Sequence, residues 1–314
     1  MSYAEQTEWK SIQAFLPPTY RIDAGNAPEE EYWSWRGHGV HLDRFPNAAA
    51  PAKVILFHGV GTNGRQMSTI VGLPLFRAGL ETVAIDMPGY GETRVAPDAK
   101  VAYDTWVDLA RDFIAYEKSR DSRPIFLYGL SAGGMLTYHA AALSGQVAGI
   151  IGMTFLDQQL SQVREETALT PLFSKIGTPL IHWLAGTPLA ALKMPMWLAS
   201  KMHTLVNDRK ALKACLHDST SAGNWASMRF LSSYLAYRPA IAPESFDICP
   251  VLLTQPAEDR WTPLHLSELF LRRITKVPVE TRMLGNAGHY PIEEPGLSQL
   301  TQAIIAFVHG RIGS

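Results

Sequence analysis

Ser131 lies at the centre of Gly129-Leu130-Ser131-Ala132-Gly133, where a glycine stands two residues away on either side. The apolar run 125–128 precedes this motif, and a helix-like stretch, 135–143, follows it. A serine on a sharp turn between a strand and a helix exposes its hydroxyl, and the glycines leave room for the neighbouring backbone. The placement therefore predicts that Ser131 is a nucleophile.

A serine hydroxyl is a weak nucleophile until a base accepts its proton, and histidine is the expected base. Of the ten histidines, His289 stands in the loop 286–291, after the last expected strand and before the last expected helix. From this loop its side chain can reach back over the strand ends. His139 lies more than two helical turns beyond Ser131, so we expect a structural role for it. Surface or packing roles are expected for His182, His203 and His217.

An acid must orient His289 and stabilise the imidazolium that forms during proton transfer. Asp259 is the first candidate because it comes just after the expected strand 251–254. Glu258 is adjacent to it, and Asp157 follows another expected strand, so both are alternatives. All three fit the chain order of nucleophile, acid and histidine.

Two backbone amides must stabilise the oxyanion that forms on the substrate. Ala132, directly after the nucleophile, would supply one of them. The other is expected from Val60 in His58-Gly59-Val60-Gly61, with Gly61 as the adjacent alternative. No histidine pair has the spacing of a metal site on one helix face, and this chemistry requires neither a metal nor an organic cofactor.

Alternating strands and helices must position these residues. Four apolar runs are expected as buried strands: 54–57, 82–85, 125–128 and 147–155. Between them, 66–78 can be helical although Gly72 and Pro74 weaken it, and 103–119 has clear helical periodicity. Residues 32–36 and 40–45 are expected as two strands joined by a turn, with the first thirty residues as an arm over the fold. Such alternation predicts an α/β fold with a mostly parallel central sheet flanked by helices.

The alternation stops near Asp157, and only helix-like apolar stretches follow until about Phe246. Strands resume at 251–254 and 279–284, and a last helix is expected over 297–308. We therefore expect one core with a helical lid. Residues 1–156 form the N-terminal part of this core, 157–246 form the lid insertion, and 247–314 form the C-terminal part.

The composition narrows the classes of function. The net charge is -1, 18 % of the 314 residues are charged and no basic run occurs, which argues against a nucleic-acid partner. Cys215 and Cys249 cannot form a disulfide framework, and the acidic, polar start has no signal-peptide pattern, so we expect the cytoplasm.

One apolar stretch, 176–199, is long enough to cross a bilayer. Pro179, Pro188 and Pro195 interrupt it. Short helical pieces follow from these breaks, so we expect a buried or interfacial helical layer that suits contact with a lipid surface, and no transmembrane span.

These residues together resemble the α/β-hydrolase family, in its lidded esterase and lipase-like branch. The resemblance covers about 54–155 and 250–308. Its motifs are His58-Gly59 as the oxyanion loop, residues 86–93 as the D-x-P-G-x-G-x-[ST] loop, residues 129–133 as the nucleophile elbow, Asp259 with Pro263 as the acid loop, and Gly288-His289 as the histidine loop. In that family Asp86 would structure its loop, so the resemblance gives it no catalytic role.

The motifs and the resemblance together predict a serine hydrolase that acts through a Ser131-His289-Asp259 triad and an acyl-enzyme. We expect a small-molecule carboxylic ester with an apolar, medium-chain or aromatic acyl group, preferred over charged esters. The residues expected to contact it are Gly59, Gly61, Trp183, Met196, Trp197 and Tyr290.

The same triad serves acyl transfer, lactone opening and carbon–carbon bond hydrolysis, which stay as alternative reactions. A non-catalytic binding protein on the same fold is a further alternative, although such proteins often lack a triad member. Because Ser131, Asp259 and His289 are all in place, the esterase interpretation is favoured.

Overall fold

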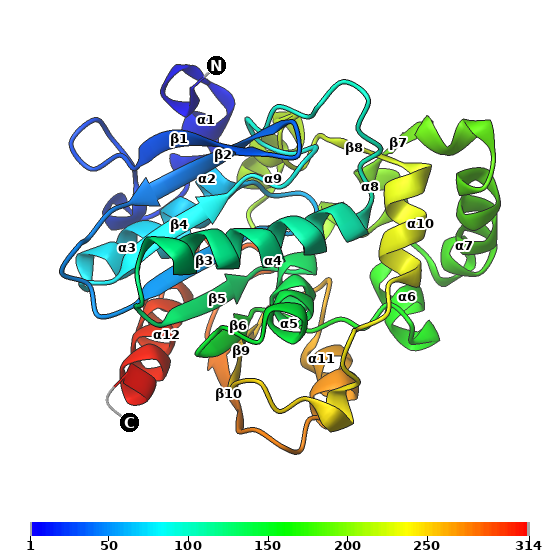
Figure 1. Cartoon of the computed structure of the whole chain (residues 1–314). Coiled ribbons are helices and arrows are strands. Elements are labelled where there is room, and N and C mark those ends of the chain that lie inside the picture. Colours follow the sequence, from blue (N-terminus) through cyan, green and yellow to red (C-terminus); the bar gives the residue numbers. More distant parts are fainter. Residues whose placement is uncertain (1, 313–314) are drawn as a thin grey trace.

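The computed structural model describes residues 2–312, apart from the side chain of Phe173. Across these residues, eight strands form one sheet in the order β1-β2-β4-β3-β5-β6-β9-β10 (Figure 1). The β1–β2 and β2–β4 pairs are antiparallel, and the other pairs are parallel. The strands are β1 Glu29–Trp35, β2 His38–Phe45, β3 Lys53–Phe57, β4 Glu81–Ile85, β5 Ile125–Gly129, β6 Gly149–Gly152, β9 Val251–Pro256 and β10 Val279–Leu284. The mostly parallel sheet expected from the sequence is confirmed.

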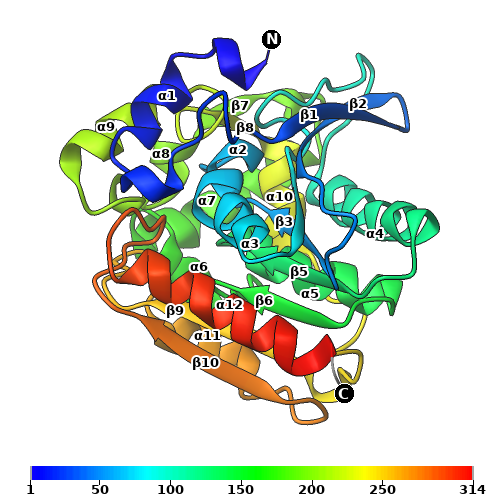
Figure 2. The ribbon, with the colours of Figure 1, turned by 90° about the vertical axis from the view of Figure 1, so that its left-hand side faces the viewer.

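Helices cover both faces of the sheet. Figures 1 and 2 show α4 and α5 on one face and α3 and α12 on the other. The helices outside the expected insertion are α1 Glu8–Gln13, α2 Gly64–Met67, α3 Leu73–Arg77, α4 Tyr103–Arg120, α5 Ala132–Ser144, α11 Leu264–Leu271 and α12 Gly296–Ile312. This arrangement explains the continuous apolar runs, because strands covered on both faces have no solvent-facing side.

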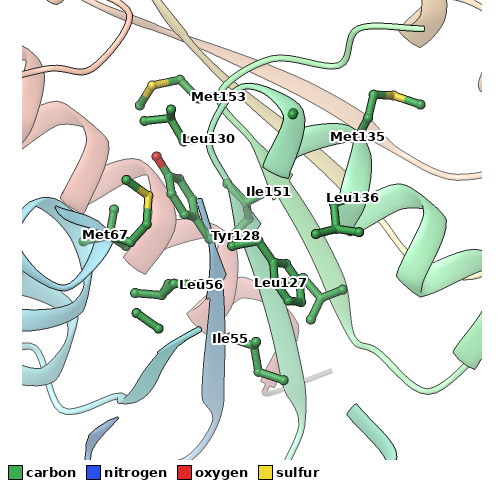
Figure 3. Packing of buried hydrophobic residues seen from close by; sticks show 14 of the residues in the cluster. Ile55, Leu56, Met67, Leu127, Tyr128, Leu130, Met135, Leu136, Ile151 and Met153 are labelled. Atoms are coloured by element: carbon green, nitrogen blue, oxygen red, sulfur yellow. The ribbon is translucent and has the colours of Figure 1, made fainter. Parts of the chain in front are cut away.

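The central strands are buried along their whole length. Every residue of β3 and β5 is buried, and β3 pairs in register with both β4 and β5. Figure 3 shows Ile55 and Leu56 of β3 among Leu127, Tyr128 and the neighbouring side chains of α5 and β6. The strands that end at the candidate site are therefore held rigidly in the core.

Two expected elements differ from the structure. The run 147–155 forms only a short strand, Gly149–Gly152. The chain then leaves the ladder, and the Phe155 N–H donates to Ser267 Oγ of α11 at 3.0 Å. The expected helix 66–78 divides into α2, one turn of π-helix at Ser68–Gly72 and α3. Gly72 allows close contact with the sheet, and Pro74 occupies the first turn of α3, where its missing N–H is tolerated.

The 157–246 segment leaves the sheet after β6 and returns at β9, and these two strands are direct neighbours in the sheet. It contains α6 Ser161–Thr167, α7 Pro171–Ala185, α8 Met196–Ala199, α9 Arg209–His217 and α10 Met228–Ala236. It also contains a two-stranded antiparallel sheet, β7 Lys193–Pro195 and β8 Trp225–Ser227. The expectation of helices alone was therefore wrong, because three-residue strands are too short to give a period-two pattern.

The stretch 176–199 is divided among α7, β7 and α8. No helix within residues 2–312 is long and apolar enough to cross a membrane. The side of α7 that carries Leu172, Ile176, Leu180 and Trp183 is exposed to solvent, each side chain being more than half accessible.

The first residues fold back over the sheet and are fixed by a buried ionic network. The Tyr3 hydroxyl donates to the carboxylate of Asp86 at 2.9 Å. Asp86 also contacts His41 Nδ1 at 2.9 Å, and His41 Nε2 lies 3.1 Å from Glu30. The Arg65 guanidinium pairs with Glu30 and with Asp43. Asp86 thus links the arm to the loop after β4, in agreement with the loop-structuring role that the resemblance implies.

Glu30, His41 and Asp43 each offer a ligand atom within 4.8 Å of the others. Both nitrogens of His41 already face carboxylates, and Arg65 compensates Glu30 and Asp43. The cluster is therefore a charge-balanced network, and its donors do not suit a cation.

His41 makes the stability of this network depend on pH. Burial alone would lower the pKa of His41, but hydrogen bonds to Asp86 and Glu30 raise it to about 10. Its folded pKa therefore exceeds the ordinary value of about 6.5, so its contribution is complete below that pH and is lost as the pH rises towards 10. We expect the difference in unfolding free energy between wild type and His41→Gln, measured by urea denaturation, to shrink steadily from pH 6.5 to 10.

His309→Gln is the matched control, because His309 is exposed on α12. Its difference from wild type should show no such trend. A constant difference between wild type and His41→Gln across this pH range would contradict the prediction.

Candidate active site

The turn at Ser131 depends on glycine at both flanking positions of the motif. Ser131 has φ 54° and ψ -122°, a strained conformation between the end of β5 and the start of α5. A Cβ atom at Gly129 would lie 1.9 Å from the carbonyl oxygen of Gly133. One at Gly133 would lie 2.5 Å from the carbonyl oxygen of Phe57. No side chain fits at either position, so the two glycines allow the serine to stand at the tip of the turn.

His289 and Asp259 are brought together from the loops after β10 and β9. His289 Nδ1 lies 2.9 Å from Asp259 Oδ2, and both side chains are buried. A carboxylate only accepts hydrogen bonds, so Nδ1 carries the proton and Nε2 presents its lone pair. Nε2 is buried and has no hydrogen-bond partner within residues 2–312. The arrangement leaves Nε2 ready to accept a proton.

Asp259 is held by three further hydrogen bonds from its own loop. The backbone N–H groups of Trp261 and Thr262 donate to Oδ1 at 2.9 and 2.8 Å, and the Thr262 hydroxyl donates to Oδ2 at 2.7 Å. Burial alone would raise the pKa of Asp259, but its interaction with His289 and the hydrogen bonds from Thr262 hold it below its ordinary value. The carboxylate therefore stays ionised and fixed in orientation.

The two alternative acids lie elsewhere. The Glu258 side chain is exposed, while its backbone N–H donates to the carbonyl of Ala287 at 3.0 Å and ties the acid loop to the histidine loop. Asp157 Oδ2 lies 3.7 Å from Arg273 Nη1, and Asp157 Oδ1 accepts a hydrogen bond from the backbone N–H of Gln159. Of the three candidates, the structure pairs only Asp259 with His289.

His58 fixes the loop after β3. The Met87 N–H donates to His58 Nε2 at 2.9 Å, so the ring proton lies on Nδ1, which donates to the Gly59 carbonyl at 2.8 Å. Burial lowers the pKa of His58 and keeps it neutral in this role. The loop that carries Val60 is thereby anchored to both the strand end and the loop after β4.

Val60 and Ala132 lie at the same cavity as Ser131. Ala132 is the first residue of α5, so its N–H has no acceptor within the helix. The described residues supply no acceptor for the Val60 N–H either. Gly61, the alternative donor, has φ +93° and faces Met202. Two backbone amides, one of them at a helix N-terminus, therefore belong to residues that line the cavity beside Ser131.

The cavity beside Ser131 has a volume of about 780 Å³, its opening included. Trp261 and Thr262 of the acid loop form part of its wall, and the 157–246 segment supplies most of the rest. Most of the wall is apolar, with Leu156, Ile181, Met196, Leu231 and Leu235 prominent. Such a wall suits a largely apolar group beside Ser131.

The residues expected to contact substrate have different positions. Met196 lines the cavity, and Gly59 packs against the Cβ atom of Ser131. Trp183 and Trp197 lie outside the cavity wall and are 64 % and 55 % exposed. Tyr290 is fully buried, and its hydroxyl oxygen lies 3.4 Å from the carbonyl oxygen of Gln66. Gly61 faces Met202. Met196 thus lines the cavity and Gly59 contacts Ser131, whereas the other four are not among the residues that line the cavity.

Three histidines for which a structural or surface role was expected lie away from Ser131. His139 is buried next to Tyr103 and Tyr237, and this burial lowers its pKa to about 3. His182 Nδ1 lies 2.8 Å from Ser232 Oγ, and His217 Nδ1 lies 2.7 Å from the carbonyl of Lys213. None of them approaches Ser131 closely enough to line its cavity.

Sequence reasoning missed Trp261, Thr262 and Arg164. The Trp261 ring packs against His289 with centroids 4.7 Å apart, and its indole N–H donates to the carbonyl of Thr167 in the 157–246 segment at 3.0 Å. Trp261 and Thr262 stand two and three residues after Asp259. At this spacing an aspartate side chain accepts hydrogen bonds from the backbone of its own turn, so the spacing could have indicated both residues. Arg164 gave no such signal, because it stands in a short polar helix.

Comparison with known proteins identifies the family of this chain. Residues 54–297 match the family model described as the alpha/beta hydrolase family. Protein phosphatase methylesterase 1 of Bos taurus is 27 % identical over 135 residues, which are 43 % of this chain and 33 % of the methylesterase. The chain spans a third or less of the length of the first curated relatives that it matches.

Two solved structures share the fold. The monoacylglycerol lipase of Paleococcus ferrophilus has a TM-score of 0.68 at 18 % identity, covering 87 % of this chain and 99 % of the lipase. A soluble variant of the monoglyceride lipase of Saccharomyces cerevisiae has a TM-score of 0.71 at 16 % identity, covering 94 % and 99 %.

Proposed function

The chain belongs to the alpha/beta hydrolase family, and on that premise we propose that it is a serine hydrolase that cleaves carboxylic esters through an acyl-enzyme. The observation that carries the proposal is the His289–Asp259 pair, whose unpartnered Nε2 complements a serine at a strained turn beside a cavity. The methylesterase and monoglyceride lipases that it resembles act on esters, as their names say, which supports the same class of bond.

In the proposed reaction, the Ser131 hydroxyl attacks the ester carbonyl while His289 Nε2 accepts its proton. The amides of Val60 and Ala132 hold the negative charge on the carbonyl oxygen. His289, kept in place by Asp259, then protonates the leaving alcohol. Water enters, loses a proton to His289 and releases the acid from Ser131.

The largely apolar cavity favours a small-molecule ester with a medium-chain or aromatic acyl group. We take the 157–246 segment as the lid that selects this group. The exposed apolar side of α7 fits contact with a lipid surface from which such esters are drawn. Both cysteines are free and buried, which fits a reducing compartment, and we propose the cytoplasm.

The proposal is tested with neutral 4-nitrophenyl esters of increasing acyl length. We expect a rapid burst of nitrophenol as the acyl-enzyme forms, and kcat/KM highest for an acyl chain of intermediate length. Ile181 lies in the cavity wall, so Ile181→Trp should shift the optimum to shorter chains by filling space. Leu180→Trp on the exposed side of α7 is the matched control and should keep the wild-type optimum. Hydrolysis of no ester by the folded protein would reject the proposal.

A further inference from the structure

Among the described residues that line the largely apolar cavity, Arg164 is the charged one. It lies on α6 and lines the cavity together with Ser131 and Ala132. Its side chain is only partly accessible, and Nη1 donates a hydrogen bond to the carbonyl of Gln158. This hydrogen bond fixes one side of the guanidinium and leaves its other N–H groups to find acceptors.

The carboxylates near Arg164 in the chain contact other side chains. Glu165 lies 3.6 Å from Lys175, and Glu166 lies 2.8 Å from His265. Asp157 is near Arg273. Within residues 2–312, no carboxylate forms an ion pair with Arg164. The guanidinium therefore has no carboxylate partner in the described chain, beside an apolar wall that strengthens electrostatic interactions.

Hydroxyl groups accompany this charge. Ser174 and Thr178 are four residues apart on α7, so they share one side of the helix, and both line the cavity. Ile181 continues the same side into the apolar part of the wall. The cavity thus combines an apolar passage with a guanidinium and two hydroxyls, a set of donors that suits an anionic oxygen group.

We propose that the substrate carries a carboxylate in addition to the ester that Ser131 attacks, and that Arg164 binds this carboxylate. The inference deepens the proposed ester hydrolysis and rests on it. Water cleaves the ester to an acid and an alcohol as before, and the second carboxylate takes no part in the bond changes. Arg164 determines specificity: it holds the anionic end while an apolar spacer lies against Leu156, Ile181 and Leu231.

From the sequence, neutral esters were expected to be hydrolysed faster than charged ones. An ester with a single carboxylate at the far end of its apolar spacer should show the opposite preference. A guanidinium that meets a carboxylate with two parallel hydrogen bonds gains both affinity and orientation. A neutral chain end would leave the charge without a partner.

The test compares matched pairs of esters. The first pair is the mono-4-nitrophenyl ester of octanedioic acid and 4-nitrophenyl octanoate, which differ by a carboxylate on the acyl side. The second pair is 4-carboxyphenyl octanoate and phenyl octanoate, which differ by a carboxylate on the alcohol side. For the side that Arg164 binds, wild type should prefer the carboxylate ester by about 10- to 100-fold in kcat/KM, mainly through KM. Arg164→Gln should abolish this preference, and Arg164→Lys should retain part of it.

Arg209→Gln is the matched control, since it removes the same charge from an exposed position in the same segment, away from the cavity. It should keep the full preference. Equal kcat/KM for charged and neutral members of both pairs, with neutral esters still hydrolysed, would overturn the inference and leave the proposed function standing.

A binding measurement separates the two proposals if no ester is hydrolysed. Octanoate is titrated calorimetrically into Ser131→Ala and into Ser131→Ala with Arg164→Gln. Binding that is about tenfold weaker without the guanidinium supports the carboxylate site independently of catalysis. Equal affinities would overturn it.

Discussion

Replacing Ser131 by alanine is expected to lower kcat/KM for 4-nitrophenyl esters by about 10⁴-fold or more, because the residual rate then comes only from binding and the oxyanion amides. The fold should persist, since Ser131 Oγ forms no hydrogen bond within the described chain and alanine keeps the Cβ atom on which Gly59 packs. The measurement is steady-state kinetics alongside stoichiometric labelling with a fluorophosphonate, which reacts with an activated serine.

Ser144→Ala provides the control within the same helix. Ser144 is the last residue of α5. It lies about 18 Å along the helix from Ala132, the first residue, because each residue adds a rise of 1.5 Å. Its substitution should leave labelling and kinetics unchanged. A Ser131→Ala protein that still reacts with the probe at one site per chain would place the nucleophile elsewhere.

Asp259→Asn is expected to lower kcat by about 10³- to 10⁴-fold with a small change in KM. The amide keeps the size of the side chain, but its NH₂ group would donate to His289 Nδ1. The ring proton would then move to Nε2, and the ring could no longer accept a proton from Ser131. Rates are compared at a pH where the wild type is fully active, after circular dichroism has established that the variant is folded.

The other acids considered from the sequence are the controls for this experiment. Asp157→Asn and Glu258→Gln should each retain kcat within about threefold of wild type, because neither side chain contacts His289. A loss in Glu258→Gln equal to that in Asp259→Asn would show that the acid loop rearranges during catalysis, against the assignment made here.

Local signals in the sequence indicated the loops that carry Ser131, Asp259 and His289. The glycines around Ser131 and the positions of Asp259 and His289 in loops after expected strands are patterns of a few residues. In a parallel sheet, such loops meet at one edge whatever the rest of the chain does. The choice of Asp259 over Glu258 was less certain, because adjacent residues differ only in the direction of their side chains. The turn held by Thr262 decides that direction.

The cavity wall could not be predicted in the same way. On α7, Ile181 faces the cavity while Leu180 and Trp183 face solvent. Apolar residues occur on both sides of the helix, so the period of the sequence does not indicate which side is covered. The same ambiguity led us to expect Trp183 and Trp197 at the substrate. Arg164 was overlooked for the opposite reason, because a charge in a short polar helix is ordinarily solvated.

The direct pairing of β6 with β9 has a consequence for how this chain can change over evolution. The 157–246 segment starts and ends at neighbouring strands, Ile150 being paired with Val251. It is therefore a closed loop on the core, and doubling the length of such a loop costs only about 0.6 kcal/mol in chain entropy. Ser131, Asp259 and His289 all lie outside it. Insertions, deletions or exchange of this segment can therefore alter which ester is accepted, at little thermodynamic expense and without rebuilding the groups proposed to break the bond.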